Sequence, residues 1–92
     1  MSILTVFNLT TMDLDKYNEA IRGLEAAGQG KPKGRLYHIA VRNDDGSMIV
    51  TDIWESAELL EAFGKTLIPV LTKAGVTPVD PIVYPVINVI EG

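Results

Sequence analysis

The sequence predicts an α+β fold of the ferredoxin-like type, with a four-stranded antiparallel sheet and two helices on one of its faces. Two observations lead to this prediction. Segments with β-rich composition and segments with helical spacing follow one another in the order strand, helix, strand, strand, helix, strand. This order is that of two split β-α-β units. The chain has 92 residues, which fits one domain over residues 1–92 and not two.

The first strand is expected over Ile3–Leu9, a β-rich run. A helix follows, and Asp13 is its expected N-cap because a carboxylate can accept from the free backbone N–H groups of the first turn. Four apolar positions of this helix recur at helical spacing: Leu14, Tyr17, Ile21 and Leu24. They predict one buried stripe on a helix that ends near Ala27-Gly28, where glycine is a usual stop.

Residues 35–42 and 47–55 are the expected second and third strands. Asn43–Gly46 between them is typical of a type I turn closed by a left-handed glycine. Such a turn fixes the register, because a slip of one residue would turn every side chain to the other face. The register pairs Arg42 with Met48, Ala40 with Val50, His38 with Asp52 and Leu36 with Trp54.

Ser56 is the expected N-cap of the second helix. Gly64 and Pro69 interrupt its apolar pattern, so we expect a helix to residues 63–65, a kink, and a further turn to Lys73. The last strand is expected over Ile82–Ile90. Pro85 cannot donate to a ladder, so it marks an edge, a bulge or a crossing point between subunits.

The second and third strands are largely apolar on both faces, whereas a sheet with one solvent face alternates between apolar and polar residues. The face opposite His38 carries Tyr37, Ile39, Val41, Ile49, Thr51 and Ile53. A large exposed apolar patch is typical of a partner surface. We therefore expect a homodimer whose two sheets face each other.

Composition excludes several classes of function. Eight Lys and Arg against twelve Asp and Glu give a net charge of −4, and no basic stripe suits a nucleic acid or an acidic membrane. Cysteine is absent and His38 is the single histidine, so a thiolate or multi-histidine metal site within one chain is excluded. No signal-peptide pattern and no membrane-spanning apolar run is visible, so a cytoplasmic protein is expected.

The order of elements and three short motifs resemble the antibiotic biosynthesis monooxygenase-like (ABM-like) family of the dimeric α+β barrel superfamily. The motifs are Asn8-Leu9-Thr10, Ile53-Trp54-Glu55-Ser56 and Tyr84-Pro85-Val86-Ile87-Asn88. The resemblance covers nearly the whole chain. It implies a homodimer with a pocket between helices and sheet in each subunit, and an activity among the family's cofactor-free monooxygenases of aromatic polyketides.

The resemblance also implies substrate-binding residues. Several active members place an asparagine on the first strand, where this chain has Asn8. They also tend to have a tryptophan in the second helix, where this chain has Phe63, with Trp54 just before the helix. The haem-degrading members bind iron through a histidine of that helix, which this chain lacks. No cofactor is therefore expected.

The cross-strand pair of His38 and Asp52 is the strongest candidate for a catalytic role. Opposed residues on neighbouring strands lie about 4.5–5.5 Å apart at their Cβ atoms. The carboxylate would hold one imidazole tautomer and leave the other ring nitrogen free as a general base. In a cofactor-free oxygenase this base would take a proton from an acidic phenol or enol, and the resulting carbanion would react with oxygen. Alternatively, the pair satisfies two polar groups in a dimer core.

Asn8, Trp54, Tyr17 and Phe63 are the candidate substrate-binding residues. Trp54 suits a flat aromatic ligand but is equally well explained as a core aromatic. Tyr17 could donate to a ligand or pack in the buried stripe. The predicted function is a homodimer that binds an apolar or aromatic small molecule and resembles cofactor-independent monooxygenases of planar enolisable or phenolic compounds. The corresponding enzyme would be a cofactor-free monooxygenase or an isomerase. The alternative is a non-catalytic dimeric binding or stress-related module with a structural His38–Asp52 pair.

Overall fold

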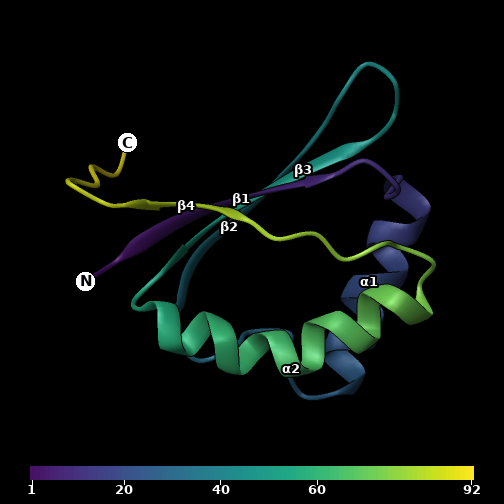
Figure 1. Cartoon of the computed structure of the whole chain (residues 1–92), viewed down its shortest axis with the longest axis horizontal. Coiled ribbons are helices and arrows are strands. Elements are labelled where there is room, and N and C mark those ends of the chain that lie inside the picture. Colours follow the sequence, from purple (N-terminus) through teal and green to yellow (C-terminus); the bar gives the residue numbers. More distant parts are fainter.

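The computed structural model describes all 92 residues and contains the expected elements in the expected order. They are β1 (Ile3–Leu9), α1 (Leu14–Ala26), β2 (Arg35–Arg42), β3 (Met48–Trp54), α2 (Ala57–Lys73) and β4 (Ile82–Pro85). All neighbouring strands pair antiparallel, in the order β2-β3-β1-β4. Both helices lie on one side of the sheet (Figure 1). The predicted ferredoxin-like fold is confirmed, and neither helix has the length and apolarity to cross a membrane.

Both helices begin at the predicted caps. The Asp13 carboxylate accepts from the backbone N–H of Lys16 at 2.9 Å, and the Ser56 hydroxyl accepts from that of Leu59 at 3.3 Å. The predicted interruption of α2 is wrong, because the helix runs unbroken past Pro69. Pro69 lies on the exposed side of α2, where water can hydrate the carbonyl that loses its partner. Leu14 is also not part of the buried stripe, since 45% of it is exposed at the first position of α1.

The β2–β3 register is as predicted over most of its length, including the pair His38 and Asp52. The predicted pairing of Leu36 with Trp54 is wrong. A bulge between Arg35 and Tyr37 places Arg35 opposite Trp54 instead, and leaves Leu36 49% exposed. Because Trp54 faces the helices, the bulge turns Arg35 toward them as well.

The last strand is shorter than predicted and ends at Pro85. Its pairing partner β1 begins at Ile3, which lies opposite Pro85, so no further β1 residue is available for a ladder. The chain continues along the sheet through one more backbone bond, from Val86 N–H to the carbonyl of Ser2 at 3.0 Å. The apolar residues beyond it are exposed, Ile87 to 93%.

The core lies between the sheet and the helices. Alternate residues of β1 and β3, from Ile3 to Leu9 and from Met48 to Trp54, are buried on this side. The opposite sheet face is uncovered and apolar, with Ile39 exposed to 54% and Val41 to 49%. His38 alternates with these two residues along β2 and therefore faces the helices.

Candidate functional site

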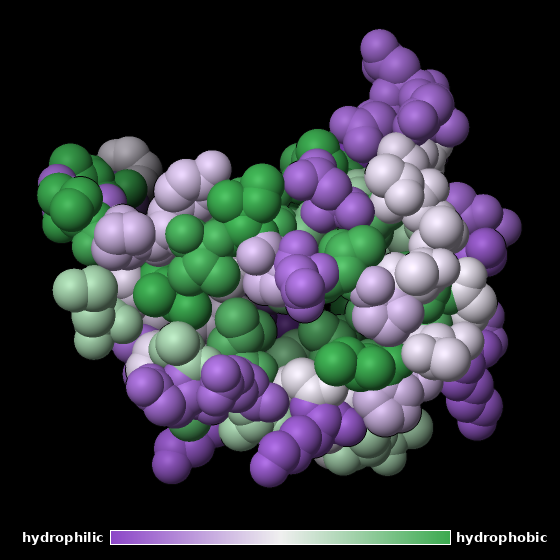
Figure 2. Space-filling view, in the orientation of Figure 1, coloured by the Kyte–Doolittle hydropathy of each residue, from purple (hydrophilic) through white to green (hydrophobic).

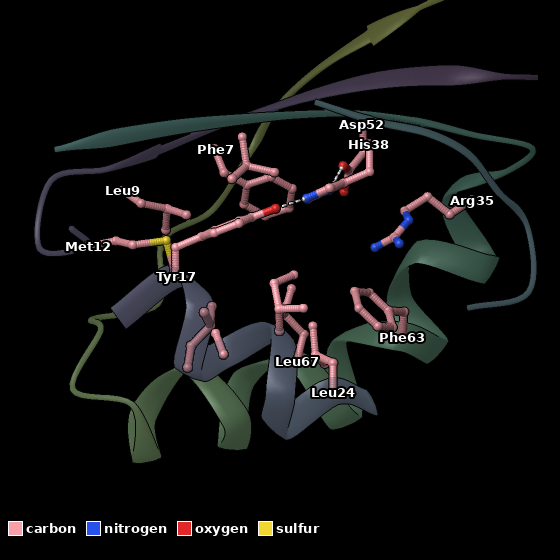
Figure 3. Close-up of a pocket in the computed structure, with 14 residues that line it drawn as sticks. Phe7, Leu9, Met12, Tyr17, Leu24, Arg35, His38, Asp52, Phe63 and Leu67 are labelled. Atoms are coloured by element: carbon pink, nitrogen blue, oxygen red, sulfur yellow. Dashed lines mark hydrogen bonds and ion pairs between the residues drawn. The ribbon is translucent and has the colours of Figure 1, made fainter. Parts of the chain in front are cut away.

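Three polar side chains meet on the helix-covered face of the sheet (Figure 3). His38 on β2 and Asp52 on β3 are cross-strand partners, with 2.7 Å between His38 Nδ1 and Asp52 Oδ1. Tyr17 reaches them from α1, with its hydroxyl 2.7 Å from His38 Nε2. The Asp52 side chain is 6% exposed and the His38 side chain 23%, so the pair is largely shielded from water.

With Asp52 ionised and His38 neutral, the two contacts of the imidazole have one consistent set of donors and acceptors. An ionised carboxylate can only accept, so His38 Nδ1 carries a proton and donates it to Asp52. His38 Nε2 is then the unprotonated nitrogen and accepts from the Tyr17 hydroxyl. The ring nitrogen that the sequence predicts to be free is therefore occupied. The three residues form a relay that ends at the Tyr17 oxygen, whose lone pairs remain available to a ligand.

The surroundings keep Tyr17 protonated. Burial raises the pKa of Tyr17 above its ordinary value, and the negative charge of Asp52 raises this pKa further. The positive charge of Arg35 acts in the opposite direction and lowers the Tyr17 pKa, but burial is the largest effect. Tyr17 is therefore a neutral hydroxyl near neutral pH. It can pass a proton to His38 while it accepts another.

The relay forms the polar end of an apolar cavity of about 50 Å³ between the sheet and both helices. Its lining is Phe7, Leu9, Met12, Tyr17, Ala20, Ile21, Leu24, Arg35, His38, Val50, Asp52, Phe63, Leu67 and Leu71. This volume holds a few water molecules and not an aromatic ring. Apolar side chains also gather across the middle of the molecule in the view of Figure 2, over the space between sheet and helices.

A larger groove of about 480 Å³ lies beside the cavity, between α2 and the segment 78–81 that leads into β4. Phe7, Leu67 and Leu71 line both spaces. These three side chains are therefore the wall between the cavity and the groove. A ligand larger than a few waters requires this wall to move.

The structure brings together four of the six predicted site residues: Tyr17, His38, Asp52 and Phe63. Trp54 is completely buried behind Phe63, with 5.3 Å between the ring centroids, and does not line the cavity. Asn8 is exposed, and it alternates with the cavity-lining Phe7 and Leu9 on β1. Its side chain therefore lies on the opposite face of the sheet.

Arg35 is a site residue that the sequence does not indicate. Its guanidinium Nη2 donates to the carbonyl of Gly30 at 3.1 Å, and its Cζ lies 6.0 Å from the centroid of the Phe63 ring. It lines the cavity only because of the bulge after it. The single local signal is Gly34, whose φ of +90° permits the tight approach of this segment to Leu59 in α2.

Known proteins resemble this chain in fold and not in sequence. No family model and no curated protein matches the sequence. Among solved structures, Rv0793 from Mycobacterium tuberculosis aligns over 99% of this chain and 100% of its own, with a TM-score of 0.67 at 13% identity. A proposed antibiotic biosynthesis monooxygenase from Chloroflexus aurantiacus J-10-fl aligns over 99% and 98%, with a TM-score of 0.69 at 9% identity. SnoaB from Streptomyces nogalater, a cofactor-independent oxygenase, aligns over 99% and 96%, with a TM-score of 0.63 at 11% identity.

The chain has the fold of antibiotic biosynthesis monooxygenases. The resemblance found in the sequence is thus confirmed for the architecture over nearly the whole chain. At these identities the ABM-like fold is what is shared, and the reaction has to be argued from the residues of this cavity. No group of three or more His, Asp or Glu side chains stands close enough together to hold a metal ion.

Proposed function

We propose that the protein is a homodimeric, cofactor-independent oxygenase of planar enolisable or phenolic compounds. The observation that carries this proposal is the Tyr17–His38–Asp52 relay, which ends in an apolar cavity with two hydrogen bonds of 2.7 Å. The ABM-like fold supports it by analogy, since it is shared with a cofactor-independent oxygenase.

The relay would act as the general base. The hydroxyl of a phenol or enol donates to the Tyr17 oxygen, and the Tyr17 proton moves to His38 Nε2. Asp52 stabilises the imidazolium that forms, because its carboxylate already accepts from His38 Nδ1. His38 is thus the base, as the sequence predicts, but it acts through Tyr17 and not directly on the substrate.

The remaining steps need only oxygen as a co-substrate. The substrate anion gives an electron pair from carbon to O₂, which forms a C–O bond and a peroxide anion. The peroxide takes back the proton held by His38, through Tyr17. Loss of water from the hydroperoxide then leaves a carbonyl, so that a CH₂ group and O₂ become C=O and H₂O. The apolar cavity walls keep bulk water from the carbanion.

The uncovered apolar sheet face supports the homodimer. Exposed Tyr37, Ile39 and Val41 on β2 lie on the same face as Ile82 and Tyr84 on β4, which the register places beside β1. Burial of apolar surface contributes roughly 25 cal/mol per Å² to stability. A second copy stacked on this face would therefore stabilise the pair by removing these apolar side chains from water. The helix-covered cavity of each subunit stays clear of such an interface.

The small size of the cavity favours a second candidate function, a non-catalytic dimeric binding module. In that case His38 and Asp52 satisfy each other's hydrogen-bonding groups inside the fold, and the Tyr17 hydroxyl satisfies the second imidazole nitrogen. The two candidates differ in turnover. A module would bind a ligand, or nothing, without consuming oxygen.

Oxygen uptake with anthrone and 2-naphthol, one a planar enolisable ketone and the other a phenol, tests the proposal. We expect uptake by the wild type and a loss of about 10²- to 10⁴-fold in kcat for Tyr17→Phe and for His38→Gln. Tyr37→Phe, on the uncovered face, is the matched control and should keep the wild-type rate. No uptake above the buffer rate, or full activity in Tyr17→Phe, overturns the proposal. Binding without uptake selects the module.

A further inference from the structure

We propose that Arg35 makes this cavity a site for anions, so that its ligand is a ring with a carboxylate or phenolate oxygen held by the guanidinium. The proposal deepens the proposed function, since it concerns the ligand of the same cavity. It goes further by naming the charge of that ligand and the residue that selects it.

The first observation is that the charge of Arg35 has no partner. No Lys or Arg side chain forms an ion pair in the structure, so no carboxylate lies within 4.0 Å of the guanidinium. A guanidinium carries five N–H donors in a planar fork. Only Nη2 has a protein acceptor, the carbonyl of Gly30 at 3.1 Å. The other donors are left for water or for a ligand.

The second observation is where these donors lie. Figure 3 shows the guanidinium pointing from the start of β2 into the space between Phe63 and the His38–Asp52 pair. The Phe63 ring beneath it, with its centroid 6.0 Å from Cζ, limits how the fork can turn. A half-buried cation in an apolar lining is costly unless it is paired, and an anionic oxygen is the group that would pair it.

The third observation is that Arg35 and the relay act on the same space. The positive charge of Arg35 lowers the pKa of Tyr17 against the effects of burial and of Asp52, so its field reaches the Tyr17 hydroxyl. An anionic oxygen beside Arg35 would therefore lie at the polar end of the cavity, and its ring would occupy the space that opens toward the groove when the wall of Phe7, Leu67 and Leu71 moves. The planar fork of arginine suits a carboxylate in two parallel hydrogen bonds and a phenolate in one.

Binding of three probes tests this proposal by calorimetry: benzoate, 4-nitrophenolate and the neutral benzyl alcohol. We expect wild-type protein to bind at least one of the two anions about 10- to 100-fold more tightly than benzyl alcohol, which is the range of a charged hydrogen bond. Tighter benzoate binding indicates a carboxylate ligand, and tighter 4-nitrophenolate binding indicates a phenolate. Arg35→Gln should remove this preference without changing the affinity for benzyl alcohol.

Two further variants separate charge from structure. Arg35→Lys keeps the charge without the fork and should retain part of the preference. Arg42→Gln removes an exposed charge from the far end of β2 and should bind like the wild type. Equal affinities of wild type for all three probes, no binding at all, or an equal loss for every probe in Arg35→Gln would overturn the proposal. Because the assay needs no oxygen and no turnover, its result is independent of whether the relay is catalytic.

Discussion

Gly34 holds the segment before β2 against α2, and replacing it with alanine is predicted to destabilise the protein strongly. Its φ is +90°, in the region that side chains other than glycine rarely adopt. An added Cβ would also lie 2.4 Å from Cδ1 and 2.9 Å from Cβ of Leu59. The Cβ of Leu59 is fixed to the helix backbone, so a change of rotamer relieves only part of the overlap.

Gly46 is the matched control. Its φ is also +90°, but an added Cβ there would meet nothing within 4 Å. Gly46→Ala therefore carries the backbone strain alone, about 1–2 kcal/mol. Gly34→Ala carries the same strain and an overpacking cost of about 1–3 kcal/mol, together about 2–5 kcal/mol. For a domain whose stability is about 5–15 kcal/mol, the larger loss is a substantial fraction.

Urea unfolding followed by the fluorescence of Trp54 measures both losses. Trp54 is the single tryptophan and is fully buried, so its signal reports the core directly. The free energy of unfolding should fall by about 1–3 kcal/mol more in Gly34→Ala than in Gly46→Ala. Equal losses in the two variants would refute the reasoning, because the contact with Leu59 would then have no energetic consequence.

Three further predictions concern the cavity and the uncovered face. Burial raises the pKa of Tyr17, so the stability linked to this group is present below about pH 10 and is lost as the pH rises through the raised pKa. Urea midpoints between about pH 9 and 11 should therefore fall less steeply in Tyr17→Phe than in the wild type, and parallel curves would contradict this. Leu67→Ala should open the wall to the groove, cost about 2–3 kcal/mol of stability, and tighten benzoate binding; unchanged binding would show that the wall does not limit access. Ile39→Lys should raise the dimer dissociation constant at least about tenfold in sedimentation, and an unaltered constant would place the interface elsewhere.

The parts of the fold that the sequence predicts are those that depend on local chemistry. Asp13 and Ser56 cap their helices because their side chains reach the first turn whatever the rest of the chain does. The turn at Asn43–Gly46 fixes the hairpin, as Gly46 N–H donates to the Asn43 carbonyl at 2.9 Å. The His38–Asp52 pair follows from this register alone.

The parts that the sequence misses depend on contacts between distant segments. The bulge before Tyr37 accompanies the approach of Gly34 to α2, which no pattern within β2 reveals. It alone brings Arg35 into the cavity. The contact of Tyr17 with His38 depends on how α1 lies on the sheet, so spacing could place Tyr17 on the buried stripe but could not give it a partner. The end of β4 depends on where β1 begins.

The polar groups of the cavity are not what packing alone would select. Taking a carboxylate such as Asp52 out of water costs several kcal/mol, and apolar residues of similar volume often serve a core equally well or better. Yet Tyr17, His38, Asp52 and Arg35 all converge at one end of a lining that is otherwise apolar. Hydrogen bonds offset this cost for three of them, whereas the Arg35 charge has no counter-ion. A purely structural role of these residues does not explain why Arg35 has no counter-ion. A bound anionic ligand would supply that counter-ion.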